Sequence, residues 1–296
     1  FEECSRGIFV SAGSTKAVFC RKSGTVSSLE MAGKAIIKDV AGIVHGPRLQ
    51  VERAFNDSDD WMRRPFLAAG LTQLRFHPYA MKAVREDGAV KVTCPVRVTG
   101  AKSGGFEYSA EWTFRADGTV LVRNFMEPFG KVPDIPRVGS FMRLNGAFEN
   151  VAYYGRGPWE NMIDRKAGCD IALWRSTVTA QYVDYLRPQD CGGKTDVRWV
   201  EFTDPKDGRG VRFSAIGEPF FMQALRFTRE DLDSSRHRPT EPRKYIPLVP
   251  RDEICFSLDC RQMGLGCYSC GPIPLEQYRF KPAKTEWSYL ISPVGE

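Results

Sequence analysis

Three features are scarce or missing in this sequence of 296 residues. It has only three histidines. It has no apolar run near the ~20 residues that a membrane-spanning helix needs. Nowhere do strand-like segments alternate with helical segments of about 10–15 residues. The first shortage argues against a histidine-rich metal centre, the second against a membrane protein, and the third excludes a parallel α/β sheet or barrel.

A strong charge imbalance is also missing. The chain carries 42 Lys and Arg against 36 Asp and Glu, a net charge of +6 spread along its length. Because no basic stripe is interleaved with aromatic residues, nucleic acid is not expected as a partner. Hydrophobic residues make up 42% of the chain, which suffices for a large core and excludes intrinsic disorder.

The nine cysteines form an odd, scattered set. Such a set predicts mostly reduced thiols rather than a disulfide framework. Cys267 and Cys270 make a C-x-x-C motif, which could be half of a zinc site or a redox pair. No second C-x-x-C accompanies it, and we favour two unrelated loop cysteines.

Period-two alternation of apolar and polar residues dominates the chain. It is clearest at residues 16–31, 81–127 and 199–216, where Asp-Gly pairs or glycine clusters separate the alternating runs. These dipeptides supply the positive φ angles that tight hairpins need. We therefore predict an all-β fold with few short helices, a large antiparallel sandwich that forms a single domain over residues 1–296.

Helical signals are few. Asp57 is a candidate N-cap for a segment over residues 59–74, which Pro65 interrupts. Thr228 and Asp231 have the spacing of a capping box that opens one or two helical turns. The proline-rich stretch 238–250 is expected to form a surface loop.

The acidic run 56–60 has oxygen-bearing side chains at alternate positions, as calcium loops do. It lacks the central glycine and the distant glutamate of an EF-hand. We favour a solvated turn with local hydrogen bonds, and calcium binding is the alternative.

Residues 153–199 are the part of the chain richest in aromatic and polar side chains. Trp, Tyr, Arg, Asn and Gln together suit sugar recognition, because rings stack on pyranose faces and planar groups bond hydroxyls. The candidates for this role are Arg156, Trp159, Asn161, Gln189 and Trp199. The alternative, which composition alone favours, is that such residues hold a large sandwich together without touching a ligand.

Four sequence blocks carry a family resemblance. Residues 154–161 read YGRGPWEN and are followed by Asp164-Arg165. In chain order, Arg53-Ala54 with Asp57 and Asp59 is the first block and residues 154–165 are the second. The third block combines RPQ at 187–189 with KTDVRW at 194–199. The fourth comprises LD at 258–259, RQMGLG at 261–266 and GP at 271–272. In this order they resemble the C-terminal domain of the large glycoside hydrolase family 2 beta-galactosidases.

The resemblance implies a supersandwich of the galactose-mutarotase-like type that follows a catalytic TIM barrel. In the family, the barrel holds the two catalytic glutamates and the Mg and Na sites, and terminal beta-galactosides are hydrolysed with retention. A barrel needs about 250 residues of alternating strands and helices. Since this chain has none, we expect no catalytic residues, metal ligands or cofactor here, and an isolated chain without activity.

On this view the chain is a fragment of a longer enzyme, an interpretation that the absence of an initiator Met also favours. Its partners are then the catalytic barrel of the same polypeptide and a galactoside, and the resemblance allows a homo-oligomeric parent enzyme, since family members often form oligomers. A cytoplasmic or periplasmic location, the oligomeric state and the aglycone preference stay open.

One family feature is changed here. The loop after M-G-L-G places a Trp against the sugar in the family, whereas this chain has Cys270 at that position and a loop one residue shorter. Tyr268 is the candidate to replace the ring. Asp190-Cys191 in place of Glu-Asn and Phe55 in place of Pro are further departures that the local structure should tolerate.

Two rival functions differ in class. The first is a carbohydrate-binding module that holds a sugar on the sandwich face through the candidates named above. The second is a free-standing aldose mutarotase, which needs a carboxylate and one or two histidines within hydrogen-bond reach. Only His45, His77 and His237 are present for that role.

Overall fold

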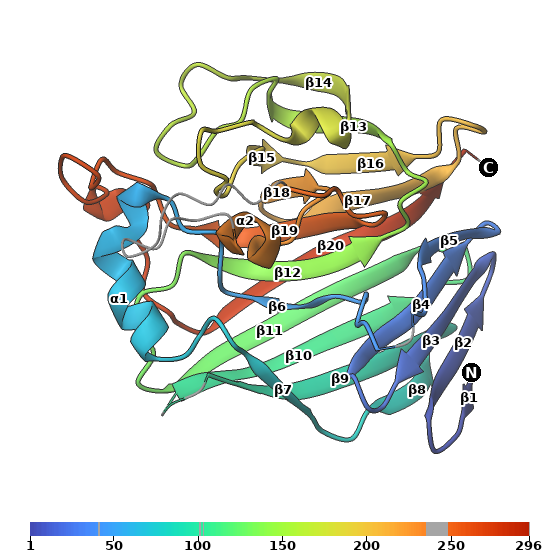
Figure 1. Ribbon diagram of the computed structural model, residues 1–296. Helices are drawn as coiled ribbons and strands as arrows, with labels where there is room; N and C mark the ends of the chain where they lie inside the picture. Colours follow the sequence, from blue (N-terminus) through green and yellow to red (C-terminus); the bar gives the residue numbers. More distant parts are fainter. Residues whose placement is uncertain (41, 101, 103, 235–247, 296) are drawn as a thin grey trace.

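The computed structural model describes residues 1–40, 42–100, 102, 104–234 and 248–295. In this part of the chain, antiparallel strands form three sheets (Figure 1). The amino-terminal sheet contains, in chain order, β1 (Glu2–Glu3), β2 (Gly7–Ala12), β3 (Thr15–Cys20), β4 (Thr25–Met31) and β5 (Lys34–Ile37). None of the helices described is long and apolar enough to cross a membrane.

The large sheet has ten strands. Their order is β14 (Asp170–Thr177), β13 (Asn150–Gly157), β16 (Trp199–Thr203), β17 (Gly210–Ile216), β20 (Thr285–Val294), β11 (Val120–Gly130), β10 (Gly104–Phe114), β9 (Ala89–Thr99) and β7 (Arg75–Pro78), and β8 (Lys82–Glu86) also pairs with β9. The covering sheet runs β15 (Lys194–Val197), β18 (Phe220–Leu225), β19 (Ile254–Gln262), β12 (Arg137–Leu144) and β6 (Arg48–Gln50).

Aromatic side chains join the sheets into one core. Phe19 of the amino-terminal sheet meets the large sheet edge to face, with its ring centroid 5.6 Å from that of Trp112. Phe256 of the covering sheet lies 5.0 Å from both Phe202 and Phe213 of the large sheet. These contacts bury one face of each sheet, as a sandwich requires. The prediction of an all-β antiparallel sandwich is confirmed.

The Asp-Gly pairs form the predicted hairpin turns. Between β8 and β9, Asp87 has φ 51° and Gly88 has φ 75°, both in the left-handed region that a two-residue hairpin loop needs. Gly118 and Gly208 likewise have positive φ values, at the turns that precede β11 and β17. Local turn chemistry therefore sets the register of these strands.

The first helical segment differs from the prediction. A 3₁₀ turn, η1 (Asp57–Asp59), leads into α1 (Asp60–Ala68), and the N-cap is Asn56 rather than Asp57. The Asn56 side chain accepts a hydrogen bond from the Ser58 N–H, and the Asp59 carboxylate accepts one from the Asn56 N–H. Pro65 lies inside α1, which ends at Ala68 because the chain turns at Gly70 with φ 70°.

The capping box at Thr228 is confirmed. The Thr228 N–H donates to the Asp231 carboxylate at 2.8 Å, and the Asp231 N–H donates to the Thr228 hydroxyl at 3.3 Å. The helix that follows is α2 (Arg229–Ser234), and the other short helical turns are η2 (Thr179–Gln181) and η3 (Glu276–Tyr278). Most of the loop expected at 238–250 lies outside the described residues, whereas residues 248–250 have no regular secondary structure.

Candidate functional site

The four sequence blocks converge on one pocket of about 350 Å³, which we name the motif pocket. Its walls come from the turn before α1, the segment after β13, the segment before β15 and the loop after β19. The lining side chains include Asn56, Asp57, Glu160, Asn161, Arg165, Tyr185, Gln189, Asp190, Leu265 and Ser269.

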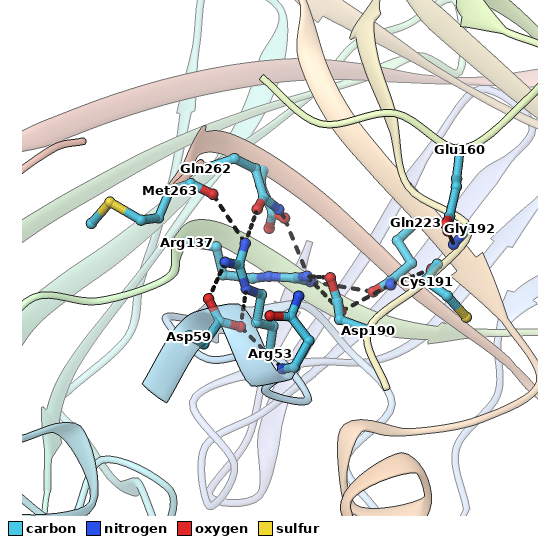
Figure 2. Close-up of polar contacts among 12 residues, drawn as sticks. Arg53, Asp59, Arg137, Glu160, Asp190, Cys191, Gly192, Gln223, Gln262 and Met263 are labelled. Carbon is cyan, nitrogen blue, oxygen red and sulfur yellow. Dashed lines mark hydrogen bonds and ion pairs between the residues drawn. The ribbon is translucent and has the colours of Figure 1, made fainter. Parts of the chain in front are cut away.

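A fully buried ion pair lies next to this pocket. Arg53 donates from Nε to Asp59 Oδ2 at 3.1 Å and from Nη2 to Oδ1 at 2.5 Å. Its remaining nitrogen donates to Gln262 Oε1 at 3.3 Å and to the Met263 carbonyl at 3.1 Å (Figure 2). Burial by itself lowers the pKa of Arg53, but the Asp59 carboxylate outweighs it and raises that pKa. Asp59 is thus held by the chain itself, which argues against the calcium alternative.

A second buried arginine ties the third and fourth blocks together. Arg137 Nη2 donates to both carboxylate oxygens of Asp190, at 2.8 and 2.9 Å, and its Nη1 lies 3.6 Å from Asp259 Oδ2. Gln223 bridges Asp190 and the Cys191 carbonyl through its amide nitrogen (Figure 2). Burial raises the pKa of Asp259 to about 7, although Arg137 opposes the shift. Asp190 and Cys191, which line the motif pocket and which we call its floor, are therefore held in place by Arg137 and Gln223.

The second block supplies a polar wall. Glu160 accepts a hydrogen bond from the Gly192 N–H at 2.7 Å and another from the Tyr185 hydroxyl. Burial, together with Glu160, raises the pKa of Tyr185 to about 12. Lys194 is buried next to them and donates to the Gly192 carbonyl at 3.0 Å, and burial lowers its pKa to about 8.

The loop after β19 is anchored by the second block. The Gly266 N–H donates to Asp164 Oδ2 at 2.8 Å, and the Gly266 carbonyl accepts a hydrogen bond from Arg165. Leu265 and Ser269 line the pocket, while Tyr268 is 45% exposed and lies outside the lining. The loop therefore forms one rim of the pocket and presents the Tyr268 ring to solvent.

The two cysteines of this loop share one turn. Cys270 donates from its backbone N–H to the Cys267 carbonyl at 3.0 Å, and Cys267 donates to the Pro272 carbonyl at 2.9 Å. Both thiols are free and exposed. Among the described residues, no group of three or more His, Cys, Asp or Glu side chains could hold a metal ion.

Three of the predicted sugar-binding residues lie at the end of β13 and in the turn that follows it. Arg156 pairs with Asp196 at 2.5 Å and donates to the Cys169 carbonyl at 2.8 Å. Asn161 is buried and bonds within the chain, accepting from the Thr195 N–H at 2.9 Å and donating to the Trp159 carbonyl at 3.0 Å. The Trp159 side chain, in contrast, is 73% exposed. Of these three, only Asn161 lines the motif pocket.

Trp199 lies apart from the motif-pocket lining. It is on β16, where the Arg212 guanidinium lies 4.5 Å from its ring centroid. Gln189 does line the pocket. The structure thus groups Asn161 and Gln189, whereas the sugar-binding roles of all these residues, and of Tyr268 and Cys270, stay predictions.

Sequence reasoning missed Arg137 and Gln223. Arg137 is the first residue of β12, and its place between Pro136 and Val138 is the only signal, although a fully buried arginine needs a carboxylate partner. Gln223 carries no comparable signal, since its partners Asp190 and Cys191 are more than 30 residues away in sequence.

The described histidines do not take part in the motif pocket. His45 is buried, and burial followed by the Arg143 charge lowers its pKa. His77 is exposed, with its Nε2 atom 3.1 Å from the Thr99 hydroxyl oxygen. His237 lies outside the described residues.

The chain is 36% identical over 156 residues to a beta-galactosidase of Priestia megaterium, an alignment covering 52% of this chain and 14% of that protein. It is 24% identical over 261 residues to a beta-galactosidase of Actinobacillus pleuropneumoniae, covering 88% and 24%. The chain thus spans about a quarter, or less, of the length of these curated relatives.

A galactose 1-epimerase from Lactobacillus acidophilus has the same fold, with TM-score 0.50 at 9% identity over 99% of this chain and 96% of that one. The predicted galactose-mutarotase-like sandwich is therefore confirmed as a fold. The family described as beta galactosidase small chain matches residues 11–291. This chain therefore belongs to the beta galactosidase small chain family.

Proposed function

We infer that this chain is the small-chain part of a beta-galactosidase, in which it borders an active site whose catalytic groups lie on a partner barrel. The observation that carries the proposal is the family match over residues 11–291. The convergence of the family-like blocks on one polar pocket supports it, because residues far apart in sequence are brought together at a single surface.

The charges of the motif pocket support a non-catalytic role for this chain. A retaining glycosidase needs two carboxyl groups about 5–5.5 Å apart, one of them free to attack the sugar. Here Glu160 is bonded to Gly192 and Tyr185, Asp190 is bonded to Arg137, and Asp57 lies 3.4 Å from an Arg187 nitrogen. Each carboxylate already has a partner within the chain, so we assign acid, nucleophile and metal ions to the partner barrel.

The exposed loop is the part of the chain that we assign to the sugar. It is anchored at Gly266 and carries Tyr268 at its tip, with the ring 45% exposed. An aromatic ring at that place can stack on the apolar face of a galactosyl unit. Cys270, at the position of the family Trp, supplies no ring, and Tyr268 therefore takes that role.

Hydrolysis of o-nitrophenyl-β-D-galactoside tests the proposal. The assay compares the chain alone, the glycosidase barrel from the same source alone, and the two joined or mixed. We expect no turnover by the chain and a large gain when it is added to the barrel. Robust turnover by the chain, or no gain on mixing, would overturn the proposal.

The Tyr268→Ala substitution tests the loop in the active assembly. Loss of a stacking contact worth about 0.5–1.5 kcal/mol should raise KM roughly 2-fold to 10-fold. The matched control is Tyr79→Ala, since Tyr79 is exposed to a similar degree (49%) but lies on another part of the surface. Equal effects of the two substitutions would remove Tyr268 from the sugar site.

A further inference from the structure

A second pocket, which we name the edge pocket, lies where two sheets end. Its volume is about 520 Å³, and its walls come from β6, β7, β12 and the start of α2. β6 is the edge strand of the covering sheet and β7 lies at the edge of the large sheet (Figure 1). It shares no lining residue with the motif pocket, and its size is that of a small-molecule site.

Arg48 is the unusual residue of the edge pocket. Its guanidinium lies over the Phe76 ring, 4.5 Å from the centroid, and its buried Nε has no hydrogen-bond partner. Burial lowers the pKa of Arg48, and no neighbouring carboxylate in the described chain offsets this effect. A cation partly withdrawn from water without a counter-charge is unfavourable, and an anion in the pocket would relieve that state.

The other charged side chains of the edge pocket are already matched. Arg143 bonds to Glu253. Arg229 bonds to Glu230 and to Asp233, at 2.8 Å in both cases. The unmatched positive charge of the lining, within the residues that the structure describes, is therefore that of Arg48.

Two more polar groups face the edge pocket from the same direction. Side chains alternate along a strand, so Arg48 and Gln50 of β6 share a face, and Glu52 follows two residues later. Gln50 is only 9% exposed and its Oε1 atom has no partner. Glu52 lies 3.1 Å from Arg229 Nε, which balances its charge, and burial raises its pKa to about 8, so it adds little net negative charge to the pocket.

We propose that the edge pocket binds a small carboxylate that also carries hydroxyl groups, the chemistry of a sugar acid. Arg48 pairs with the ligand carboxylate, and Gln50 and Glu52 exchange hydrogen bonds with its hydroxyls. Apolar walls from Leu74, Phe76 and Phe141 contact the carbon skeleton. This site lies beyond the proposed galactosidase role and does not depend on it.

Calorimetric titration of the chain with three probes tests the chemistry. D-galacturonate has both the carboxylate and the hydroxyls, D-galactose has only hydroxyls, and acetate has only the charge. We expect D-galacturonate to bind at least about 10-fold more tightly than either, because a charge-assisted hydrogen bond and the hydroxyl contacts act together. D-galacturonate binding no tighter than D-galactose or acetate, or not binding at all, would overturn the proposal.

Substitutions locate the site. Arg48→Gln should weaken D-galacturonate binding about 10-fold to 100-fold, and Arg48→Lys should weaken it less, because it keeps the charge but loses the guanidinium fork. Arg64→Gln, at an exposed arginine of α1, is the matched control and should change affinity less than about 2-fold. Thermal unfolding of each variant verifies that it folds, and Gln50→Leu provides a second probe of the same site.

Unchanged binding in both Arg48→Gln and Gln50→Leu would place the ligand elsewhere and overturn the assignment. Neither outcome bears on the hydrolysis assay, since the binding measurement needs no catalytic partner.

Discussion

The motif pocket lies beside two buried arginines and the edge pocket contains a half-buried one, and the two pockets differ in how these charges are balanced. Arg53 and Arg137, beside the motif pocket, are completely buried, and each meets a carboxylate of the same chain. Arg48, in the edge pocket, meets an aromatic ring and no carboxylate of the described chain. Matched charges hold segments together. The unmatched charge of Arg48 is instead the group to which we assign the ligand carboxylate.

The largest expected effect comes from breaking a matched pair. Arg53→Met leaves Asp59 as a buried charge without its partner, and this should lower the free energy of unfolding by about 3–5 kcal/mol. Arg48→Met removes a charge that has no partner, so stability should change by less than about 1 kcal/mol, the scale of its contact with Phe76. Chemical denaturation of the two variants measures the difference.

A double variant provides the control for that comparison. Arg53→Met combined with Asp59→Asn removes both charges while an oxygen remains to accept from the Asn56 N–H. It should recover part of the lost stability. A single Arg53→Met variant as stable as the native chain, or an Arg48→Met variant equally damaged, would break the distinction between the two pockets.

Local sequence patterns predict the strands and turns of this chain but not the distant partners of its buried arginines. Alternating strands and Asp-Gly turns are local signals, and they predicted the all-β fold and its hairpins because the same residues set both pattern and turn. The partners of Arg53 are not local. Asp59 is six residues away, but Met263 is 210 residues away, and the sequence alone does not place these segments in one site.

The sugar-binding candidates illustrate the limit more sharply. Arg156 and Asn161 are candidates because their side chains can bond hydroxyls, yet both have partners within the chain, such as Asp196 and Thr195. Arg48 and Gln50 give no signal in the sequence, because polar residues that alternate with an apolar one such as Leu49 are typical of any half-exposed strand. Whether a polar side chain has a partner is a property of the tertiary structure, which no local pattern reports.

An intermediate effect is expected from pH. Burial raises the pKa of Glu52 from 4.5 to about 8, so the folded state holds a proton that the unfolded chain releases above pH 4.5. The contribution of Glu52 to the free energy of unfolding is therefore largest below about pH 4.5. It decreases as the pH rises toward 8, by at most about 1.4 kcal/mol per pH unit. Glu52→Gln should flatten that loss.

The measurement is the free energy of unfolding at pH 6 and pH 8 for both proteins. We expect the native chain to lose about 1–2 kcal/mol more than Glu52→Gln over this interval. Asp259→Asn is the corresponding test beside the motif pocket. Burial raises the pKa of Asp259 to about 7, so its pH-dependent contribution to the free energy of unfolding is lost by a lower pH than that of Glu52. Parallel pH profiles for the native chain and Glu52→Gln would contradict the raised pKa of Glu52.

Chemical modification of the exposed thiols should have the smallest effect on stability, and it tests how rigid the motif pocket is. Cys267 and Cys270 on its rim are exposed, and Cys4 is the third exposed thiol. Cys191, in its floor, is buried, and burial raises its pKa to about 12. A thiolate is the reactive species, so an aromatic disulfide reagent should modify the rim rapidly and Cys191 only as fast as the floor opens.

With the chain first reduced and then freed of reductant, we expect three fast thiols and no change in the unfolding midpoint. Mass spectrometry of the labelled peptides identifies them. Cys267→Ser and Cys270→Ser should each remove one fast thiol, and Cys191→Ser none. Labelling of Cys191 at the rate of the rim would show that the charge network around Asp190 does not keep the floor closed, and the motif pocket would then be no more rigid than the loop that borders it.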